Sequence, residues 1–430
     1  MYNTRAKLNL LAVSMGAMEA AINTEQDTDA SLLVGVDDYI NIDPRRENNA
    51  DEMTGKEEPD MIYDLGALAS ATFNFGKLQP HQAAFLLAYG LGSCATAAAG
   101  DGFLHTITPI DGDLDPARSN PSFTAVQRVA QTIVKRRFAS CFVDAVTINF
   151  TTDDWVKGTG TIKATGKRTD SVIEETVVAL DNATSLTLAE NGVHGSSAAE
   201  RLDNVQVVRA AAAGSDQYEF CTVTAVSDAT PAVLTIESLG GGGEDNLNYK
   251  ILYVPTEAAW ATFPARITET PLRVSQACLY VGGGWSGTAF VGGQAMGSVL
   301  NSFEYQLNNN MDIKFSLCAG GEYAGRAWRG GRNQVLKLNR QTRDYLLQNY
   351  MLQNENLGVR LLCEGAEYEA GHKYTLEMIF PRAGILTAPL SSDNGLVAEA
   401  GDLQVLEDDT YGSVIVRVKN LVETFAAEPA

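Results

Sequence analysis

Apolar and polar residues alternate most clearly in Val299–Leu307, where every second residue from Phe303 onward is apolar. This period of two predicts a half-buried strand. The alternation resumes over Ile313–Leu317 after Asn308–Asn310, three residues that tolerate the left-handed backbone of a tight turn. We therefore expect the two runs to pair as an antiparallel hairpin with one apolar face.

The same pattern predicts further strands in this half of the chain at Pro271–Gly284, Gln334–Asn339, Val359–Cys363, Lys373–Phe380 and Ser413–Val422. Val359–Cys363 and Lys373–Phe380 should form a hairpin that Pro381 ends, because proline cannot donate to a sheet. Between the predicted strands Gln334–Asn339 and Val359–Cys363, apolar residues at helical spacing predict a helix over Asp344–Gln353. Thr342 is its expected N-cap, and Gly358 is expected to stop it.

The first half contains one long segment without apolar periodicity. Asp37–Asp64 has ten acidic residues, three basic residues and two prolines, so we expect a loop. A connection of that length inside a compact domain is usually functional or disordered. Residues 1–22 are expected to form a short helix or an extended segment.

Regular elements surround this loop. Leu68–Phe75 is predicted to be a strand, and a helix should begin at Pro80 and close with Gly90 at the C′ position. Arg136–Phe150 is typical of a strand pair, and Gly158–Gly166 of its antiparallel return.

Composition changes between residues 171 and 264, where five short strand-like runs are separated by turn residues. This spacing predicts a small all-β barrel or sandwich, inserted between a first part (residues 1–170) and a second part (residues 265–430) of the main domain. Its run Gly240–Gly243 lacks the Lys and Ser/Thr of a phosphate-binding loop and precedes two acids, so it is expected to be a hairpin tip.

Charge and cysteine use narrow the functional classes. The 430 residues include 53 acidic and 32 basic ones, a formal net charge of -21, which argues against gripping a phosphate backbone. Six well-separated cysteines favour reduced, mostly buried thiols and synthesis in the cytoplasm. No apolar run approaches the roughly 18 residues of a membrane span.

No catalytic, cofactor-binding or metal-binding set is expected. The four histidines lack paired-ligand spacing, and the nearest nucleophile motif, Gly283–Gly287 around Ser286, fits a strand and turn better than a catalytic elbow. Arg326, Arg329 and Arg332 in the glycine-rich linker can bind an anion, but contacts to carboxylates of a subunit or loop are the favoured interpretation.

The order of several segments resembles the major tail tube proteins of long-tailed bacteriophages. The segments that carry this resemblance are the early acidic loop, Gly100–Pro109 (GDGFLHTITP), Arg136–Phe150 (RRFASCFVDAVTINF), Ser302–Asn310 (SFEYQLNNN), the glycine-arginine linker, the helix with Asp344-Tyr345-Leu346, and Leu376–Ile385 (LEMIFPRAGI). The resemblance covers roughly residues 1–170 and 265–430. Residues 171–264 depart from it and correspond to an extra domain, expected on the outer surface.

The resemblance implies a mainly β, sandwich- or barrel-type protomer with a flanking helix. Six protomers would join into a ring, and stacked rings would form the tube of a virion tail, made in the host cytoplasm. Its partners would be copies of itself and other tail proteins at the tube ends. DNA would pass through an acidic lumen without specific binding, and no membrane would be involved.

Subunit contacts are expected from the acidic loop and the arginine linker. The residues assigned to them are Arg45, Arg46, Glu57, Glu58, Arg326, Arg329 and Arg332. The alternative function is a multi-domain β protein whose insert recognises a carbohydrate or surface receptor, which would require exposed aromatic side chains clustered on one face.

Overall fold

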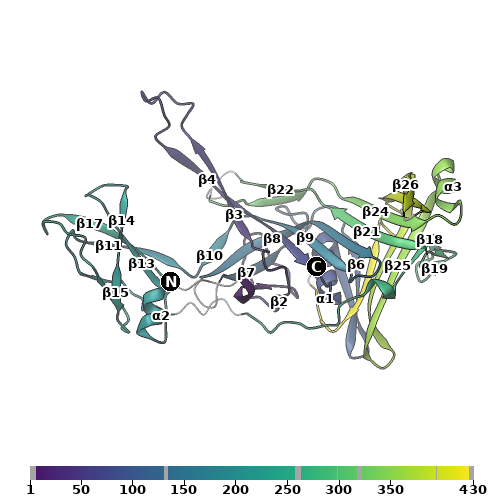
Figure 1. The fold of residues 1–430 in the computed structure, drawn as a ribbon, viewed down its shortest axis with the longest axis horizontal. Coiled ribbons are helices and arrows are strands. Elements are labelled where there is room, and N and C mark those ends of the chain that lie inside the picture. Colours follow the sequence, from purple (N-terminus) through teal and green to yellow (C-terminus); the bar gives the residue numbers. More distant parts are fainter. Residues whose placement is uncertain are drawn as a thin grey trace. The chain divides into compact units, whose positions relative to one another are not determined.

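The computed structural model describes residues 6–129, 134–256, 263–297, 299–316, 322–393 and 395–425. The fold is mainly β, with 54% strand and 8% helix, which confirms the predicted class. The described residues divide into two compact units (Figure 1). Unit 1 takes those of 1–11, 126–137 and 168–263, and unit 2 takes those of 12–125, 138–167 and 264–430. The strands of the predicted insert thus belong to unit 1, and their position outside a tube remains a prediction.

Twenty strands of the described residues join in one hydrogen-bonded network, and every register described below is antiparallel. Those in the first half of the chain are β1 (Leu10–Val13), β2 (Ala30–Leu32), β3 (Asn41–Asn48), β4 (Ile62–Phe75), β5 (Gly92–Ala99), β6 (Gly102–Pro109), β7 (Phe123–Val129), β8 (Val134–Thr151), β9 (Lys157–Ala164) and β10 (Arg168–Asp170). Those in the second half are β18 (Ala277–Trp285), β19 (Phe290–Val291), β20 (Gln294–Ala295), β21 (Leu300–Asn308), β24 (Asn333–Gln341), β25 (Asn356–Glu369), β26 (His372–Thr387), β27 (Leu390–Asp393), β28 (Leu396–Leu406) and β29 (Ile415–Asn420).

Two runs of neighbouring strands form unit 2. One run is β3-β4-β9-β8-β21-β24-β28, and the other is β18-β25-β26-β29-β6-β5. The long strand β26 joins them, because its last residues also pair with β28. Among the described residues the strands form no closed barrel. In the described registers β3 pairs only with β4, and β5 only with β6, so each leaves one edge open.

Helix α1 (Pro80–Leu91) lies inside unit 2, and all 12 of its residues are buried. A helix that is apolar on every side is stable only when it is enclosed. Phe85, Tyr89 and Phe123 form an aromatic cluster with centroids 5.0–5.2 Å apart. The left-handed residue at the end of the helix is Gly92 (φ 106°), not the expected Gly90.

The predicted hairpin of residues 299–317 is wrong. Strand β21 pairs with β8 and β24, whereas β22 (Met311–Lys314) pairs with β23 (Arg326–Arg329). Asn310 has the expected left-handed backbone (φ 49°). However, Asp144 accepts from the backbone N–H groups of Asn309 (2.7 Å) and Met311 (2.6 Å), and these bonds carry the chain out of the sheet.

Two predictions in the first half also need correction. The expected loop Asp37–Asp64 contains β3, which pairs with β4 from Asn41 opposite Ser70 to Asn48 opposite Ile62. Arg136–Phe150 is not a strand pair, because it lies within the single strand β8; the antiparallel return by β9 is confirmed.

Helix α3 (Leu346–Gln353) and strand β26 differ from expectation at their ends. The N-cap is Tyr345 rather than Thr342, and the helix ends before the left-handed Asn354 (φ 53°) rather than at Gly358. The hairpin of β25 and β26 is confirmed, but Pro381 does not end it. Pro381 falls where the register between these two strands shifts, a position that needs no N–H donor.

Seven strands and a helix make up residues 173–253 of unit 1. The four-stranded sheet has the order β11 (Ile173–Leu180), β17 (Asn246–Tyr253), β13 (Val205–Ala210) and β14 (Tyr218–Cys221), and the three-stranded sheet has the order β12 (Ser185–Thr187), β16 (Val233–Ile236) and β15 (Val223–Val226). One apolar cluster contains residues of both sheets, and helix α2 (Ala198–Asp203) contacts β13 and β15.

The run Gly240–Gly243 is not a hairpin tip. It connects β16 to β17, which belong to different sheets. The N–H groups of Gly242 (2.9 Å) and Gly243 (2.6 Å) donate to the carboxylate of Asp181. These glycines therefore bind an anion of the chain itself.

Candidate assembly surfaces

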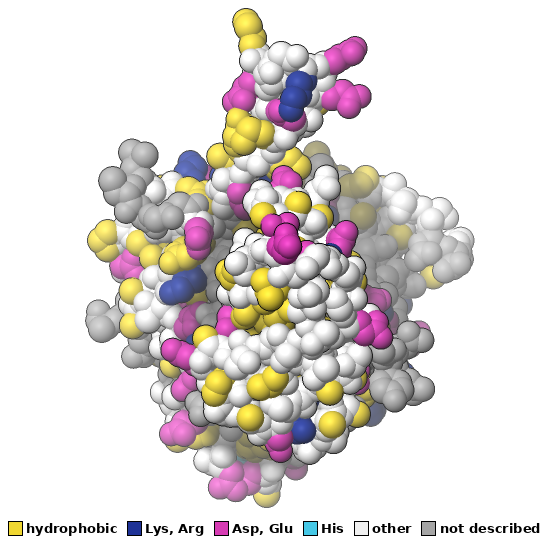
Figure 2. Space-filling model, turned by 90° about the vertical axis from the view of Figure 1, so that its left-hand side faces the viewer, with side chains coloured by type: hydrophobic (Ala, Val, Ile, Leu, Met, Phe, Trp, Pro, Cys, Tyr) yellow, Lys and Arg dark blue, Asp and Glu magenta, His cyan; other side chains and the backbone are white. Residues whose placement is uncertain are grey.

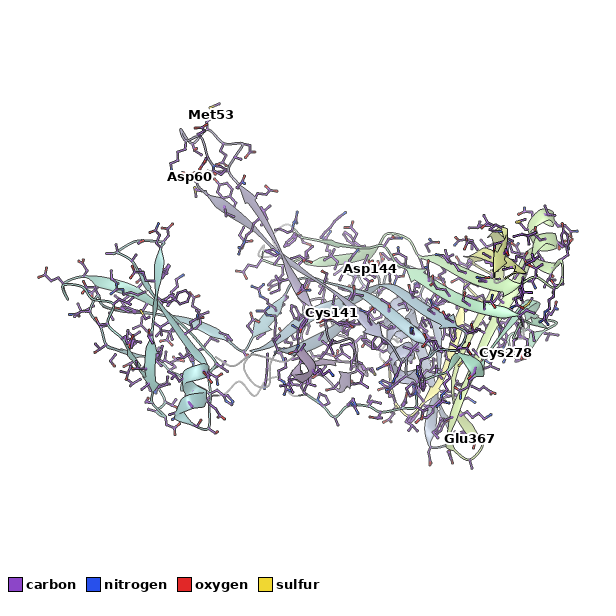
Figure 3. All side chains as sticks on the ribbon, viewed as in Figure 1. Met53, Asp60, Cys141, Asp144, Cys278 and Glu367 are labelled. Atoms are coloured by element: carbon purple, nitrogen blue, oxygen red, sulfur yellow. The ribbon has the colours of Figure 1, made fainter. Side chains whose placement is uncertain are left out.

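A two-stranded arm, residues 41–65, projects from the body of unit 2 (Figure 1). Figure 3 labels Met53 and Asp60 at its far end. Nearly every residue of β3 and the first four residues of β4 are exposed, so neither strand is covered by the body over this length. The arm is built by backbone pairing rather than by burial.

The end of the arm has its own hydrogen bonds. Asn49 is buried, and its side chain accepts from the N–H groups of Asp60 (3.1 Å) and Met61 (3.2 Å). Lys56 forms an ion pair with Asp60, and this contact, with the amide of Asn49, lowers the pKa of the Asp60 carboxyl. Tyr63 donates its hydroxyl to Glu52 at 2.7 Å. The connection between β3 and β4 is therefore a defined structure.

Exposed apolar side chains distinguish the arm from an ordinary charged hairpin. They are Met53, Met61, Ile62, Tyr63 and Leu65. Acidic side chains lie among them, and Figure 2 shows this mixture of yellow and magenta on the arm. Single exposed apolar residues are normal, but several of them close together in sequence on a projecting element are typical of an interaction site.

The expected contact residues of the acidic segment lie on the arm. Arg45 stacks on Phe315 with its guanidinium carbon 5.2 Å from the ring centroid. Arg46 lies 3.9 Å from Asp64 in an exposed pair, which contributes little by itself. Glu57 and Glu58 are exposed near the end of the arm. Their role at a subunit interface remains a prediction.

The linker arginines make contacts within the chain. Arg326 stacks on Trp328 (5.3 Å), and Arg329 donates to the side-chain oxygen of Asn120 (2.9 Å). Arg332 donates to the carbonyl of Leu91 (3.1 Å), the last residue of α1.

Arg332 matches the electrostatics of this helix end. Burial and the neighbouring Arg329 lower its pKa to about 10, so it still carries its charge at neutral pH. A cation at this position complements the negative end of the α1 dipole. The contacts of Arg329 and Arg332 are with backbone carbonyls and an amide, not with the expected carboxylates; their role between subunits remains a prediction.

A second exposed apolar surface lies where α3 meets the hairpin of β27 and β28. We call it the α3 platform, and its exposed side chains are Tyr345, Leu352, Leu386, Leu390, Leu396 and Val397. The side chain of Gln348 on α3 donates to the carbonyl of Ala388 and to Glu399 of β28 (3.0 Å), so helix and hairpin are in contact. This hairpin was not predicted from the sequence, although Asn394-Gly395 is a turn signal.

A buried ion network supports the α3 platform. The guanidinium of Arg340 lies 2.9 Å from Glu399 and 2.8 Å from Asp344. Arg340 and Glu399 are 1% and 0% exposed, whereas Asp344 is one-third exposed. Asp344 also accepts from the N–H of Leu346, in the first turn of α3. Hydrogen bonding to Arg340 lowers the pKa of Asp344.

Buried polar groups hold the N-terminal and C-terminal segments of unit 2 against its strands. Glu19 accepts from the hydroxyls of Ser122 (2.7 Å), Thr124 (2.6 Å) and Ser140 (2.6 Å), and from the N–H of Ser140 (2.8 Å). Four donors compensate for burying this carboxylate. They fix the segment around Glu19 against β7 and β8.

The C-terminal segment is held by His105. Its Nε2 lies 3.0 Å from both the side-chain oxygen of Asn420 and the carbonyl of Val422, so this nitrogen carries the hydrogen. The ring meets Phe425 edge to face at 4.7 Å. Burial lowers the pKa of His105, which favours the neutral ring.

The reactive side chains considered in the sequence do not form a catalytic or metal-binding group among the described residues. The hydroxyl of Ser286 donates to the carbonyl of Ala289 (2.9 Å) in the turn between β18 and β19. The five described cysteines are free thiols: Cys94, Cys141, Cys221, Cys278 and Cys363. Cys318 lies outside the described residues. In the described ranges, no three His, Cys, Asp or Glu side chains are grouped to hold a metal ion.

No family model matches this chain, and no curated protein matches it at a significant level. Among the described residues, no helix has the length and apolar character needed to cross a membrane.

Proposed function

We propose that the protein is a structural virion subunit, the major tail tube protein of a long-tailed bacteriophage. In this proposal six copies close into a ring, rings stack into a tube, and the genome is ejected through the lumen. The observation that carries the proposal is the arm, which presents five apolar side chains to solvent.

The exposure of these side chains is a cost that assembly would relieve. Complete burial of one large apolar side chain contributes about 1.5–3 kcal/mol. Partial burial of five therefore reaches the size of the about 4–15 kcal/mol that association costs in lost freedom. A ring or stack repeats this contact in every copy.

Open strand edges give a second line of support. The free edges of β3 and β5 are templates for pairing with another chain. Residues Ala95–Ala98 of β5 are exposed and mostly small, so another strand has close access to this edge. Closure into a ring would remove such edges.

The negative net charge of the protein suits a channel through which DNA passes. With a net charge of -21 the protein as a whole repels phosphate, so DNA would pass without specific binding. We expect a lumen wall with few Lys or Arg side chains. Other tail proteins would contact the ends of the tube, and no cofactor is required.

Electron microscopy and sedimentation of the purified full chain test the proposal. Rings or tubes should appear as concentration rises, and Ile62→Asp together with Met61→Asp should suppress them while circular dichroism stays unchanged. The matched control is Val178→Asp in unit 1, which changes an equally exposed apolar residue outside the arm. A chain that remains monomeric at high concentration in low and high salt would refute the proposal.

A second candidate function, carbohydrate recognition, is favoured by one observation in unit 1. The outward face of its four-stranded sheet carries Phe220, which is 71% exposed, opposite Val208 on β13. On the same sheet Lys250 Nζ lies 4.6 Å from the ring centroid of Tyr218 and 3.7 Å from Glu174. Aromatic rings beside charged hydrogen-bonding groups can stack on a sugar and bind its hydroxyls.

Glycan-array binding of the full chain tests this second function. Phe220→Ser should abolish binding to any glycan that the wild-type protein retains, whereas Val291→Ser, an exposed control in unit 2, should not. Absence of glycan binding by the wild-type chain, or equal binding by the Phe220→Ser variant, would reject it.

A further inference from the structure

We propose that the arm of one copy docks on the α3 platform of a second copy. This inference rests on the proposed self-assembly and specifies its partner surface. Both surfaces belong to unit 2, and Figure 1 places the arm and α3 at opposite ends of it. One copy therefore presents both halves of a contact that it cannot close on itself.

The apolar side chains of the arm form a stripe. Tyr63 and Leu65 are exposed residues two apart on β4, and the exposed Met61 immediately precedes this strand; together they span about 14 Å at roughly 3.4 Å per residue. Opposite them on β3, Glu47 pairs with Tyr63. The stripe is thus apolar along its length and acidic at its side.

The α3 platform has a matching length and character. Tyr345 and Leu352 are seven residues apart, two helical turns or about 10 Å, and so lie on one side of α3. On the adjoining hairpin, Leu390 and Val397 share a face, because Ser392 pairs with Val397 and Leu390 is two residues away on the same strand. A seam between a helix and a hairpin can receive an extended stripe of side chains.

Two exposed arginines that are close in sequence to platform residues suit an acidic partner. Arg343 and Arg382 are exposed on the segments that lead into α3 and run along β26. The arm carries the exposed carboxylates Glu57 and Glu58. Such rim pairs add specificity and association rate more than affinity.

The platform is a firm acceptor because the ion network of Arg340, Asp344 and Glu399 lies beneath it. A preorganised surface loses less freedom on binding than a loose one. The contact is heterologous, arm to platform, so each copy can bind one neighbour through its arm and another through its platform. Repetition of such a contact gives a closed ring or a continuing stack.

A mixing experiment tests this pairing. The arm variant is Tyr63→Asp with Leu65→Asp, the platform variant is Leu352→Asp with Leu390→Asp, and Val178→Asp is the control. All substituted side chains are exposed, and milder serine versions replace any variant whose circular dichroism differs from wild type. Each variant alone should need about tenfold or more protein to assemble, a change equivalent to a 1.4 kcal/mol loss of affinity.

The two variants mixed in equal amounts should form dimers and stop there. The platform variant retains a good arm and the arm variant retains a good platform, so one contact per pair survives. Sedimentation velocity measures the dimer. A platform variant that assembles like wild type would overturn the inference, and if the arm variant still fails, self-assembly through the arm stands with another acceptor.

Other results are equally decisive. Failure of the mixture to dimerise would overturn arm-to-platform pairing. A wild-type chain that never assembles would instead defeat the proposed function on which the inference rests.

Discussion

Removing the charge of Glu399 should destabilise unit 2, because it leaves the buried cation of Arg340 without its buried carboxylate partner. In Glu399→Gln the side chain keeps its size, but Arg340, only 1% exposed, loses the carboxylate 2.9 Å from its guanidinium. Breaking a buried pair in this way costs about 3–5 kcal/mol. Asp344 still contacts the guanidinium at 2.8 Å and is partly solvated, so we lower the expected loss to about 2–4 kcal/mol.

Equilibrium unfolding in urea, below the concentration at which the chain assembles, measures this loss. Tryptophan fluorescence reports on unit 2 when every chain compared carries Trp260→Phe, because the other three tryptophans, Trp155, Trp285 and Trp328, belong to that unit. Two controls separate the causes. Asp344→Asn removes the exposed partner and should cost less, whereas Arg340→Met with Glu399→Leu removes both charges and should recover most of the stability.

A Glu399→Gln variant within about 0.5 kcal/mol of wild type would refute the reasoning, since changes of that size are typical of uncritical surface positions. A double variant less stable than Glu399→Gln would also contradict it, because the stranded charge would then not be the cause. The expected loss should appear with faster proteolysis around α3, which the network supports.

Three other changes have distinct expected outcomes. Burial holds the pKa of His105 below its ordinary 6.5, so the contribution of this residue to the free energy of unfolding is present above pH 6.5 and is lost as pH falls through the lowered folded value. His105→Asn should therefore reduce the loss of stability that urea titrations measure between pH 7.5 and 5. An unchanged loss of stability in this variant would argue against the role of His105. Gly92→Ala should cost more than the about 1–3 kcal/mol of a strained left-handed residue, because its Cβ would meet Ile110 at 2.7 Å. Gly112→Ala, left-handed with no neighbour within 4 Å of a Cβ, is the control for backbone strain alone, and equal losses would show that the contact is unimportant. The thiol of Cys363, whose pKa burial raises to about 12, should resist iodoacetamide at pH 8 until the protein unfolds, and peptide mass spectrometry would reveal labelling of the folded chain that contradicts this.

Local pattern accounts for the parts of the fold that were predicted from sequence. The alternation around Phe303 identified β21, and the run after Pro80 identified α1, because side-chain periodicity follows directly from strand and helix geometry. Capping was less predictable. Gly92 rather than Gly90 ends α1, since Gly90 lies in the helix where a Cβ would be 3.1 Å from Leu307, a contact that depends on another strand.

Strand partners were decided only by the tertiary structure. The runs at residues 299–307 and 313–317 are neighbours in sequence, yet β21 pairs with β8, more than 150 residues away at Asn149 opposite Glu304. Alternation states which side of a strand is apolar, but any strand with an apolar side can supply the partner. The side chain and carbonyl of Asp144 resolve this choice by turning the chain at Asn309.

The candidate surfaces divide in the same way. The sequence by itself marked residues 37–64 as unusual through their charge, and it marked the chain as mainly β and acidic. It did not reveal that β3 pairs with β4 to make a projecting arm, or that α3 meets β27 and β28. Charge and periodicity are properties of single segments, whereas exposure depends on which segments cover one another, and only the folded chain fixes that.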